Sequence, residues 1–220
     1  MCGISGFYQL NKESVSIDVL NTMLKMQTHR GPDSEGIYYN NFVGLAHNRL
    51  SLLDLSSNGN QPFIDEEYVL VYNGEIYNFL ELKKELPQIQ FKSNSDTEVL
   101  FHYIRLFGIE KTLNSIQGMF AFSWYDIKND KLLLVRDRIG IKPLFYGIDD
   151  HKCLWFSSEL KTILSSADFE PDPIQMLFSP IGGITEKTKH KTSWKNLFAL
   201  APGHFITVEN GSLKKNEYFH

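Results

Sequence analysis

The sequence predicts an α+β protein in which helices cover antiparallel sheets. Three observations support this class. Segments rich in β-branched and aromatic residues recur between turn residues, and short turns at residues 128–130 and 147–150 join two pairs of them. Amphipathic helices are also present, but they do not alternate with strands as parallel βαβ units require. Consecutive hairpins without such units indicate antiparallel sheets.

The predicted strands follow from this enrichment. In chain order they cover residues 3–10, 42–46, 68–72, 119–125, 132–136, 144–146, 153–157 and 205–208. Helices are predicted over residues 16–28, 78–86, 95–107 and 159–164. In the first of them, Ile17, Leu20 and Leu24 recur at helical spacing.

The helix over residues 95–107 has the clearest pattern. Its apolar residues form one stripe, which should pack on a sheet: Val99, Leu100, Tyr103, Ile104 and Phe107. Ser95 and Glu98 have the spacing of a capping box, and Asn78 and Glu81 repeat that spacing at the preceding helix. Both helices are therefore predicted to begin with a side-chain cap.

Residues 166–195 differ from the rest in composition. They gather the prolines, glycines and lysines Pro171, Pro173, Pro180, Gly182, Gly183, Lys187, Lys189 and Lys191. Such residues are typical of an irregular surface segment. The fold is then expected to close over residues 194–218, so that residues 1–220 form one domain.

Composition places the chain among ordinary globular proteins, with 220 residues, 42% hydrophobic and 22% charged. The 22 Lys and Arg residues against 26 Asp and Glu give a formal net charge of −4, so a basic surface for nucleic acid is not expected. Apolar runs are far shorter than the roughly 20 residues that span a bilayer. The first residues show no basic region ahead of an apolar one, so we expect no secretory leader. We therefore expect a cytoplasmic protein that binds neither nucleic acid nor a membrane.

Cysteine and histidine are too sparse for a disulfide or a metal site. The only cysteines are Cys2 and Cys153, and the seven histidines stand apart without the local spacing of zinc ligands. We predict no metal and no disulfide. Cys153 lies within a predicted strand and is expected to be a passive core thiol.

Cys2 is the most informative residue. Removal of Met1 is feasible because Cys2 is small, and it would leave a thiol and a free α-amine on one residue. An α-amine has a pKa of roughly 7.7–8.0, close to the pH at which a general base is most useful. Such an amine is a recognised alternative to a histidine partner. Taken alone, however, Cys2 is better explained as a small residue that opens a strand.

Polar motifs elsewhere supply complementary groups. Asn73 and Gly74 follow an apolar strand, and an Asn amide beside a Gly N–H is a compact pair of donors for an oxyanion, with a plain turn as the alternative. Arg49 can hold a carboxylate through two hydrogen bonds, and Asp96 with Glu75 can hold an ammonium, although each can equally be a surface charge. Together with a thiol and a base, these groups suit the side-chain amide of an amino acid.

Eight motifs carry a resemblance to a known family. They are Met1-Cys-Gly-Ile-Ser-Gly6, His29-Arg-Gly-Pro-Asp-Ser34, Arg49-Leu-Ser-Leu-Leu-Asp54, Asn73-Gly-Glu-Ile-Tyr-Asn78, Ser95-Asp-Thr-Glu98, Gly118-Met-Phe-Ala-Phe122, Arg136-Asp-Arg-Ile-Gly-Ile-Lys-Pro-Leu-Phe-Tyr146 and Ser157-Ser-Glu-Leu-Lys161. In this order they resemble the glutaminase domain of glutamine-hydrolysing asparagine synthetases, closely over residues 1–165. Ala201-Pro-Gly-His204 resembles the end of that domain.

The resemblance implies an N-terminal-nucleophile hydrolase fold, a four-layer α/β/β/α sandwich of two antiparallel sheets between helical layers. It implies a class II glutamine amidotransferase in which Cys2, after Met1 is lost, attacks the glutamine side-chain amide and expels ammonia. Water then releases glutamate from a thioester. Asparagine biosynthesis in the cytoplasm is the implied context.

The resemblance also assigns roles. Asn73 and Gly74 would form the oxyanion hole, Arg49 would bind the α-carboxylate, and Asp96 with Glu75 would orient the α-amine. The glutamine pocket would be lined by the backbone of Leu50, Ser51, Leu52 and Leu53.

Three other features are interpreted as scaffold. Residues 136–138 are expected to brace the domain or to face a partner. His29 and His47 border the site, but they need no catalytic role because the amine serves as base. Gly31 and Pro32 are typical of residues that end a helix, which accounts for their place after the first predicted helix. This reason does not account for Arg30.

Full-length members of the family continue into a synthetase domain that uses ATP and Mg. Its Ser-Gly-Gly-x-Asp-Ser phosphate loop is missing here, and Ser179-Pro-Ile-Gly-Gly183 resembles it only superficially. We therefore expect no cofactor in residues 1–220 and a synthetase domain of the same full-length protein as partner.

The ammonia acceptor and the oligomeric state stay open at this stage. Aspartate is the expected acceptor. Alternatives are another carboxylate such as a sugar acid, a sugar phosphate or phosphoribosyl pyrophosphate, and a catalytically silent interaction module with the same fold. A homodimer is also left open.

Overall fold

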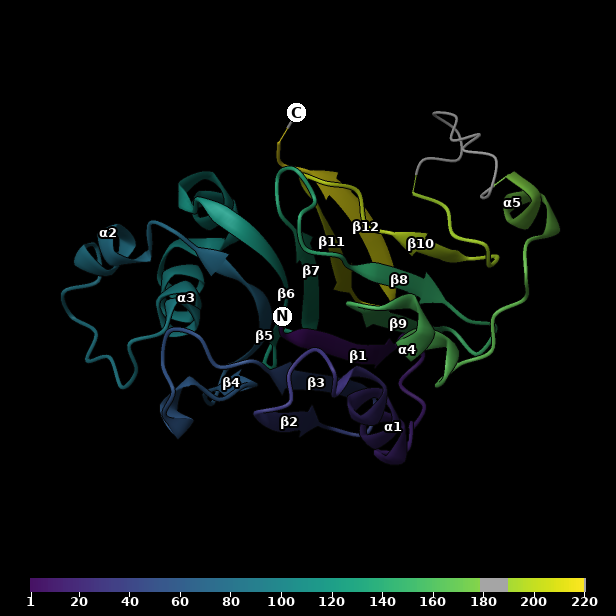
Figure 1. Cartoon of the computed structure of the whole chain (residues 1–220), viewed down its shortest axis with the longest axis horizontal. Coiled ribbons are helices and arrows are strands. Elements are labelled where there is room, and N and C mark those ends of the chain that lie inside the picture. Colours follow the sequence, from purple (N-terminus) through teal and green to yellow (C-terminus); the bar gives the residue numbers. More distant parts are fainter. Residues whose placement is uncertain (179–189, 220) are drawn as a thin grey trace.

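Two antiparallel six-stranded sheets form the centre of the fold (Figure 1). The computed structural model describes residues 1–178 and 190–219. The first sheet has the order β10-β8-β9-β1-β3-β2 and contains β1 (Gly3–Gln9), β2 (Ser34–Tyr39), β3 (Val43–Arg49), β8 (Phe145–Ile148), β9 (Cys153–Ser157) and β10 (Leu197–Ala199). The second has the order β12-β11-β7-β6-β5-β4 and contains β4 (Phe63–Ile64), β5 (Tyr68–Ile76), β6 (Gly118–Asp126), β7 (Lys131–Arg136), β11 (His204–Glu209) and β12 (Ser212–Glu217).

Helices lie on the outer faces of both sheets (Figure 1). On one side these are α1 (Asp18–Gln27) and α4 (Leu160–Leu164), and on the other α2 (Phe79–Lys84) and α3 (Asp96–Ser115). A further helix, α5 (Pro173–Phe178), lies apart from both sheets (Figure 1), and η1 (Ser57–Gly59) is a 3₁₀ turn. Among the described residues, no helix combines the length and apolar character needed to cross a membrane.

The alternation of side chains along the strands builds three apolar layers. In β5, Val69 and Val71 point into the core between the two sheets, whereas Leu70 and Tyr72 point to the core beneath α2 and α3. In β1, Phe7 faces a third core, which α1 and α4 cover. Helix, sheet, sheet and helix therefore follow in order, so the predicted four-layer α+β sandwich is confirmed.

Every predicted strand is present, but the sequence analysis missed β2, β4, β10 and β12. β4 and β10 are very short, and β2 and β12 are the outermost strands of their sheets. An outermost strand with one exposed face lacks the apolar pattern of a buried strand. The Asn210-Gly211 pair between β11 and β12, with φ angles of 52° and 71°, is a hairpin signal that could have identified β12.

The helix predictions are confirmed with two corrections of extent. α3 continues to Ser115, eight residues beyond the predicted end, and it changes direction at Gly108, where φ is 77°. α5 was missed inside the segment predicted to be irregular. Residues 179–189 of that segment, including the Ser179–Gly183 motif, lie outside the described residues.

The predicted caps are only partly correct. Ser95 Oγ accepts a hydrogen bond from the Glu98 N–H at 3.3 Å, as a capping box requires. The Glu98 carboxylate instead accepts from the backbone of Lys92 and Ser93, because the loop before α3 folds back over it. The Asn78 side chain makes no cap: its nitrogen donates to the carbonyl of Ser115, the last residue of α3, and its oxygen accepts from the Gln117 N–H, so it joins α2 to the end of α3.

The structure shows how residues 136–138 brace the domain. Arg136 donates to the backbone carbonyls of Gly140 at 2.8 Å, Lys142 at 2.9 Å and Leu200 at 2.5 Å. The fully buried Asp137 accepts hydrogen bonds from four backbone N–H groups, including those of Ile141 at 3.0 Å and Lys142 at 2.9 Å. The two side chains fix the loop between β7 and β8, and the bracing role expected for this motif is confirmed.

Replacing Asp137 by Ala is expected to destabilise the fold strongly. The change leaves four backbone donors without this acceptor, two of them in buried hydrogen bonds, and each unsatisfied buried donor costs about 1–3 kcal/mol. We expect the free energy of unfolding in urea to fall by about 3 kcal/mol or more. Asp150→Ala in an exposed turn is the control and should change it by less than about 0.5 kcal/mol. A loss below about 1 kcal/mol for Asp137→Ala would contradict this account.

Candidate active site

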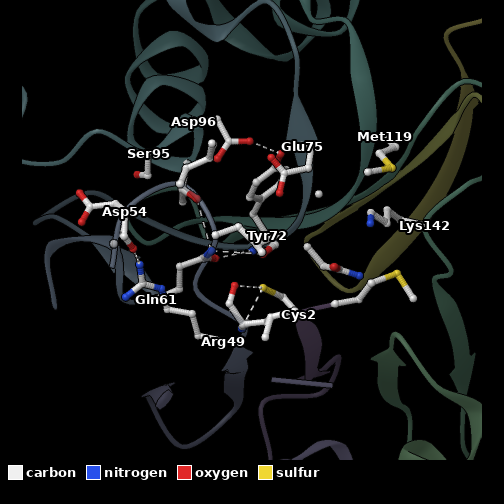
Figure 2. Close-up of a pocket in the computed structure, with 18 residues that line it drawn as sticks. Cys2, Arg49, Asp54, Gln61, Tyr72, Glu75, Ser95, Asp96, Met119 and Lys142 are labelled. Atoms are coloured by element: carbon white, nitrogen blue, oxygen red, sulfur yellow. Dashed lines mark hydrogen bonds between the residues drawn. The ribbon is translucent and has the colours of Figure 1, made fainter. Parts of the chain in front are cut away.

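A cavity of about 200 Å³ opens where the N-terminal end of β1, the C-terminal end of β3, the second half of β5 and the start of α3 meet. It brings together all the site residues predicted from the sequence except one: Cys2, Arg49, Leu50, Leu52, Leu53, Asn73, Gly74, Glu75 and Asp96. Figure 2 shows Cys2 at one end of the cavity, Arg49 beside it, Glu75 and Asp96 opposite, and Lys142 on the far wall.

The exception is Ser51. Its backbone N–H donates to the Asp33 carboxylate at 2.7 Å, and the residue lines a separate hollow on the outer side of Arg49. Leu50, Leu52 and Leu53 line the cavity as predicted. Of the four consecutive residues predicted to line the pocket, Ser51 is the one that the structure places on this separate hollow, where its N–H is held by Asp33.

The Cys2 thiol is held by one residue of the neighbouring strand end. Leu50 N–H donates to Sγ at 3.4 Å, and the thiol donates to the Leu50 carbonyl at 3.6 Å. Burial raises the pKa of this thiol, although the Leu50 N–H, the amino terminus and Arg49 act in the opposite direction. With Met1 in place the thiol is thus kept protonated, and it needs a base to become a nucleophile.

Asn73 and Gly74 lie inside β5, paired with Ala121 and Phe120 of β6. The Asn73 side-chain nitrogen is buried and has no hydrogen-bond partner among the described residues. Leaving a buried donor without a hydrogen bond is costly, so such a donor indicates a group that binds a ligand. A Cβ at Gly74 would lie 2.5 Å from the Met119 carbonyl, so only glycine fits there. The alternative that Asn73-Gly74 is a plain turn is excluded.

Arg49 is 7% exposed and holds the loop that forms one wall of the cavity. Its guanidinium donates to the Ser56 carbonyl and to the Asn60 side chain, each at 2.8 Å, and to the Asp54 carbonyl. All three acceptors are neutral, so the positive charge has no carboxylate partner in these contacts. A ligand carboxylate is the group that this charge favours.

Glu75 and Asp96 line the opposite wall. Asp96 accepts hydrogen bonds from the Tyr72 hydroxyl at 2.6 Å and from the Ile76 N–H at 2.9 Å. Burial raises the pKa of both carboxyl groups, and the charge of Asp96 raises the pKa of Glu75 further, whereas Lys142 lowers it. Two carboxylates that oppose each other's ionisation favour a cationic ligand group between them.

Lys142 is a charged residue of the cavity wall that the sequence analysis did not single out. Its motif was interpreted as scaffold, but the structure places this lysine, 5% exposed, on the cavity wall. The braced loop after β7 directs it there. The motif itself was the available signal, because a scaffold loop has no need of a buried lysine.

The two histidines and the second cysteine do not line the cavity. His47 is fully buried and donates through Nε2 to the Tyr72 carbonyl at 3.1 Å, and burial lowers its pKa to about 3. His29 contacts Glu159 at 2.9 Å. Cys153 is a free, buried thiol, as expected for a core residue. Among the described residues, the cavity therefore offers no histidine to act as a base for Cys2.

Two antiparallel sheets between helical layers, with a cysteine at the start of the central strand and facing a cavity, define the N-terminal-nucleophile class of hydrolase folds. Residues 1–219 match the family model described as a glutamine amidotransferase domain, and the chain belongs to this family.

Relatives and a solved structure agree with this assignment. A Methanocaldococcus jannaschii protein assigned as asparagine synthetase (glutamine-hydrolysing) 2 is 40% identical over 246 residues, covering 100% of this chain and 46% of that protein. Asparagine synthetase B (glutamine-hydrolysing) of Escherichia coli is 39% identical over 168 residues, covering 74% of this chain and 30% of that protein. The chain thus spans less than half the length of these relatives.

The solved structure is glutamine phosphoribosylpyrophosphate amidotransferase from Bacillus subtilis. It aligns with a TM-score of 0.71 at 18% identity, covering 99% of this chain and 49% of that chain. At this identity the likeness concerns the fold alone.

The raised pKa of Cys2 predicts slow alkylation that accelerates with pH. In the Met1-bearing chain we expect the rate with iodoacetamide, followed by mass spectrometry, to be still rising at about pH 9, because only the thiolate reacts. The control is the same chain in urea, where the rate should level off near the ordinary thiol pKa. Cys153 should react only in urea, since burial raises its pKa strongly. A plateau below about pH 8 in the folded chain would contradict the prediction.

Proposed function

We propose that this domain, once Met1 has been removed, hydrolyses the side-chain amide of L-glutamine to glutamate and ammonia through a Cys2 thioester. The observation that carries the proposal is the buried, unpartnered amide nitrogen of Asn73 on the wall of the cavity that also holds the Cys2 thiol. A thiol beside a free hydrogen-bond donor is the arrangement that acyl transfer requires.

The reaction begins with a proton transfer. The α-amine of Cys2 accepts the thiol proton while Sγ forms a bond to the amide carbon. Negative charge develops on the amide oxygen, where the Asn73 side chain and the Gly74 N–H stabilise it. The protonated amine then delivers its proton to the amide nitrogen as the carbon–nitrogen bond breaks and ammonia leaves. Water adds to the thioester carbon, the carbon–sulfur bond breaks, and the thiol regains a proton.

The charged walls of the cavity support recognition of an α-amino acid. Arg49 would bind the α-carboxylate of glutamine, and Asp96 with Glu75 would bind its α-ammonium. The raised pKa values of these carboxyl groups would then fall as the ammonium enters, so that binding favours their ionised form.

The fate of the ammonia belongs to a longer protein. Relatives named as glutamine-hydrolysing asparagine synthetases support aspartate as the acceptor and a synthetase domain of the same protein as partner. ATP and Mg would serve that domain, and residues 1–220 would act without a cofactor. A cytoplasmic location is part of the same proposal, and a homodimer stays a prediction.

Cys2 and its free amine are tested with the processed chain that begins at Cys2. It should release glutamate from L-glutamine, and Cys2→Ala or retention of Met1 should reduce this release to background, because either change removes the nucleophile or its base. Cys153→Ala is the matched control and should keep full activity. Glutamate release by Cys2→Ala, or labelling of Cys153 by a diazo-ketone analogue of glutamine, would reject the assignment.

Asn73 should affect turnover more than binding. An oxyanion donor is fully engaged only as charge develops, so Asn73→Ala is expected to lower kcat by about 10²–10³. The KM for glutamine should change by less than about threefold. Steady-state kinetics of glutamate release measure both, with Asn129→Ala in an exposed turn as control. A raised KM with kcat intact would assign Asn73 to ground-state binding.

A further inference from the structure

We propose that Glu159 is a positioning residue for the Cys2 nucleophile, and that it acts by holding Arg30 against the Cys2 carbonyl. The inference rests on the proposed role of Cys2 and adds a function for Glu159, for its neighbour Ser158 and for Arg30, which the helix stop after α1 leaves unexplained.

Arg30 connects the start of the chain to the start of α4. Its guanidinium is 8% exposed, donates through Nε to the Cys2 carbonyl at 2.9 Å and donates through Nη1 to Glu159 Oε1 at 3.2 Å. Its other terminal nitrogen is buried without a partner. Glu159 is therefore the one counter-charge in contact with Arg30 among the described residues. A buried guanidinium without its carboxylate is costly, so loss of Glu159 favours release of Arg30.

Glu159 is itself held in its ionised form. Burial tends to raise the pKa of its carboxyl group, but hydrogen bonds from His29, Arg30 and Lys161 outweigh this effect and lower the pKa. Its Oε1 atom accepts from His29 at 2.9 Å as well as from Arg30, whereas Lys161 lies 3.2 Å from Oε2. The carboxylate is thus a fixed anchor at neutral pH.

Ser158 holds Ile4, a residue of β1, through two hydrogen bonds. Its N–H donates to the Ile4 carbonyl at 2.8 Å, and its hydroxyl accepts from the Ile4 N–H at 3.0 Å. Gly3, between Ile4 and Cys2, is a buried residue of β1 that pairs with Asn48 of β3, so the ordered strand begins directly after Cys2. Without the Arg30 contact at the Cys2 carbonyl, Cys2 itself would keep only the long contacts of its thiol to Leu50, at 3.4 and 3.6 Å.

All these contacts lie on the carboxyl side of the bond between Met1 and Cys2. Removal of Met1 therefore leaves them in place, and the thiol has the same position before and after processing. Ser158 holds Ile4, and Glu159 holds Cys2 through Arg30, so this pair secures the chain on both sides of Gly3. We name this set of residues the N-terminal clamp.

A double-mutant cycle in the processed protein tests the clamp. Misplacement of a reacting group by about 1 Å costs about 10² in rate, so Glu159→Ala should lower kcat about 10- to 100-fold. The KM for glutamine should stay within about threefold, because Glu159 does not touch the cavity. Arg30→Ala should lose at least as much, and the double variant should lose no more than Arg30→Ala alone. Lys161→Ala, which contacts Glu159 but not Arg30, is the matched control.

A second measurement reads the position of the thiol without glutamine. Iodoacetamide should alkylate Cys2 at least about threefold faster in Glu159→Ala than in Lys161→Ala, because the thiol loses its burial. If Glu159→Ala does not fold, Glu159→Gln replaces it, with a smaller effect because the amide oxygen still accepts from Arg30.

The outcomes separate the two proposals. The clamp would be overturned if the kcat losses of Glu159→Ala and Arg30→Ala multiply in the double variant, or if Glu159→Ala raises KM and leaves kcat unchanged. Equal alkylation rates of Cys2 in Glu159→Ala and Lys161→Ala would also overturn it. An unaltered processed protein that releases no glutamate would reject the glutaminase function instead, while faster alkylation in the Glu159 variant would still support the clamp.

Discussion

The hydrogen bond from His47 Nε2 to the Tyr72 carbonyl is the contact on which the site depends, because it fixes one sheet against the other beside the cavity. His47 lies in β3 two residues before Arg49, and Tyr72 lies in β5 directly before Asn73. A slip between the sheets would separate the two halves of the cavity. Because burial lowers the pKa of His47 to about 3, the imidazole stays neutral and this contact does not change with physiological pH.

The cavity is electrostatically incomplete when empty. Arg49 directs its charge to neutral carbonyl and amide oxygens, and the carboxyl groups of Glu75 and Asp96 oppose each other's ionisation. An α-amino acid carries one charge of each sign. On the proposed function, its carboxylate would pair with Arg49 and its ammonium with the acidic wall, so the cavity would favour a zwitterion over a ligand with a single charge.

Much of the fold and most of the cavity residues could be predicted from the sequence. The same physical reasons explain which residues were not predicted. The strands at the centre of each sheet have a strong apolar pattern. Cys2 directly precedes β1, Asn73 lies within β5 and Asp96 opens α3, so polar motifs beside or within clearly patterned elements marked these three positions. Ser51 lies outside the cavity because its backbone N–H is held by Asp33, a contact that the motif alone does not show. Lys142 was missed because its direction depends on the buried Asp137 turn, which is visible only once the loop has folded.

Met1 lines the mouth of the cavity and is 57% exposed, so the peptide bond that must be cut lies at the surface. On the proposed mechanism, this single residue acts as a propeptide. While Met1 is attached, the Cys2 nitrogen is part of a peptide bond and cannot act as a base, although the N-terminal clamp already holds the thiol. The folded chain would therefore be inactive until Met1 is removed. Ammonia is toxic when it is released without an acceptor. On this mechanism it would be formed only after Met1 has been removed, so this one cleavage would set the time at which activity starts.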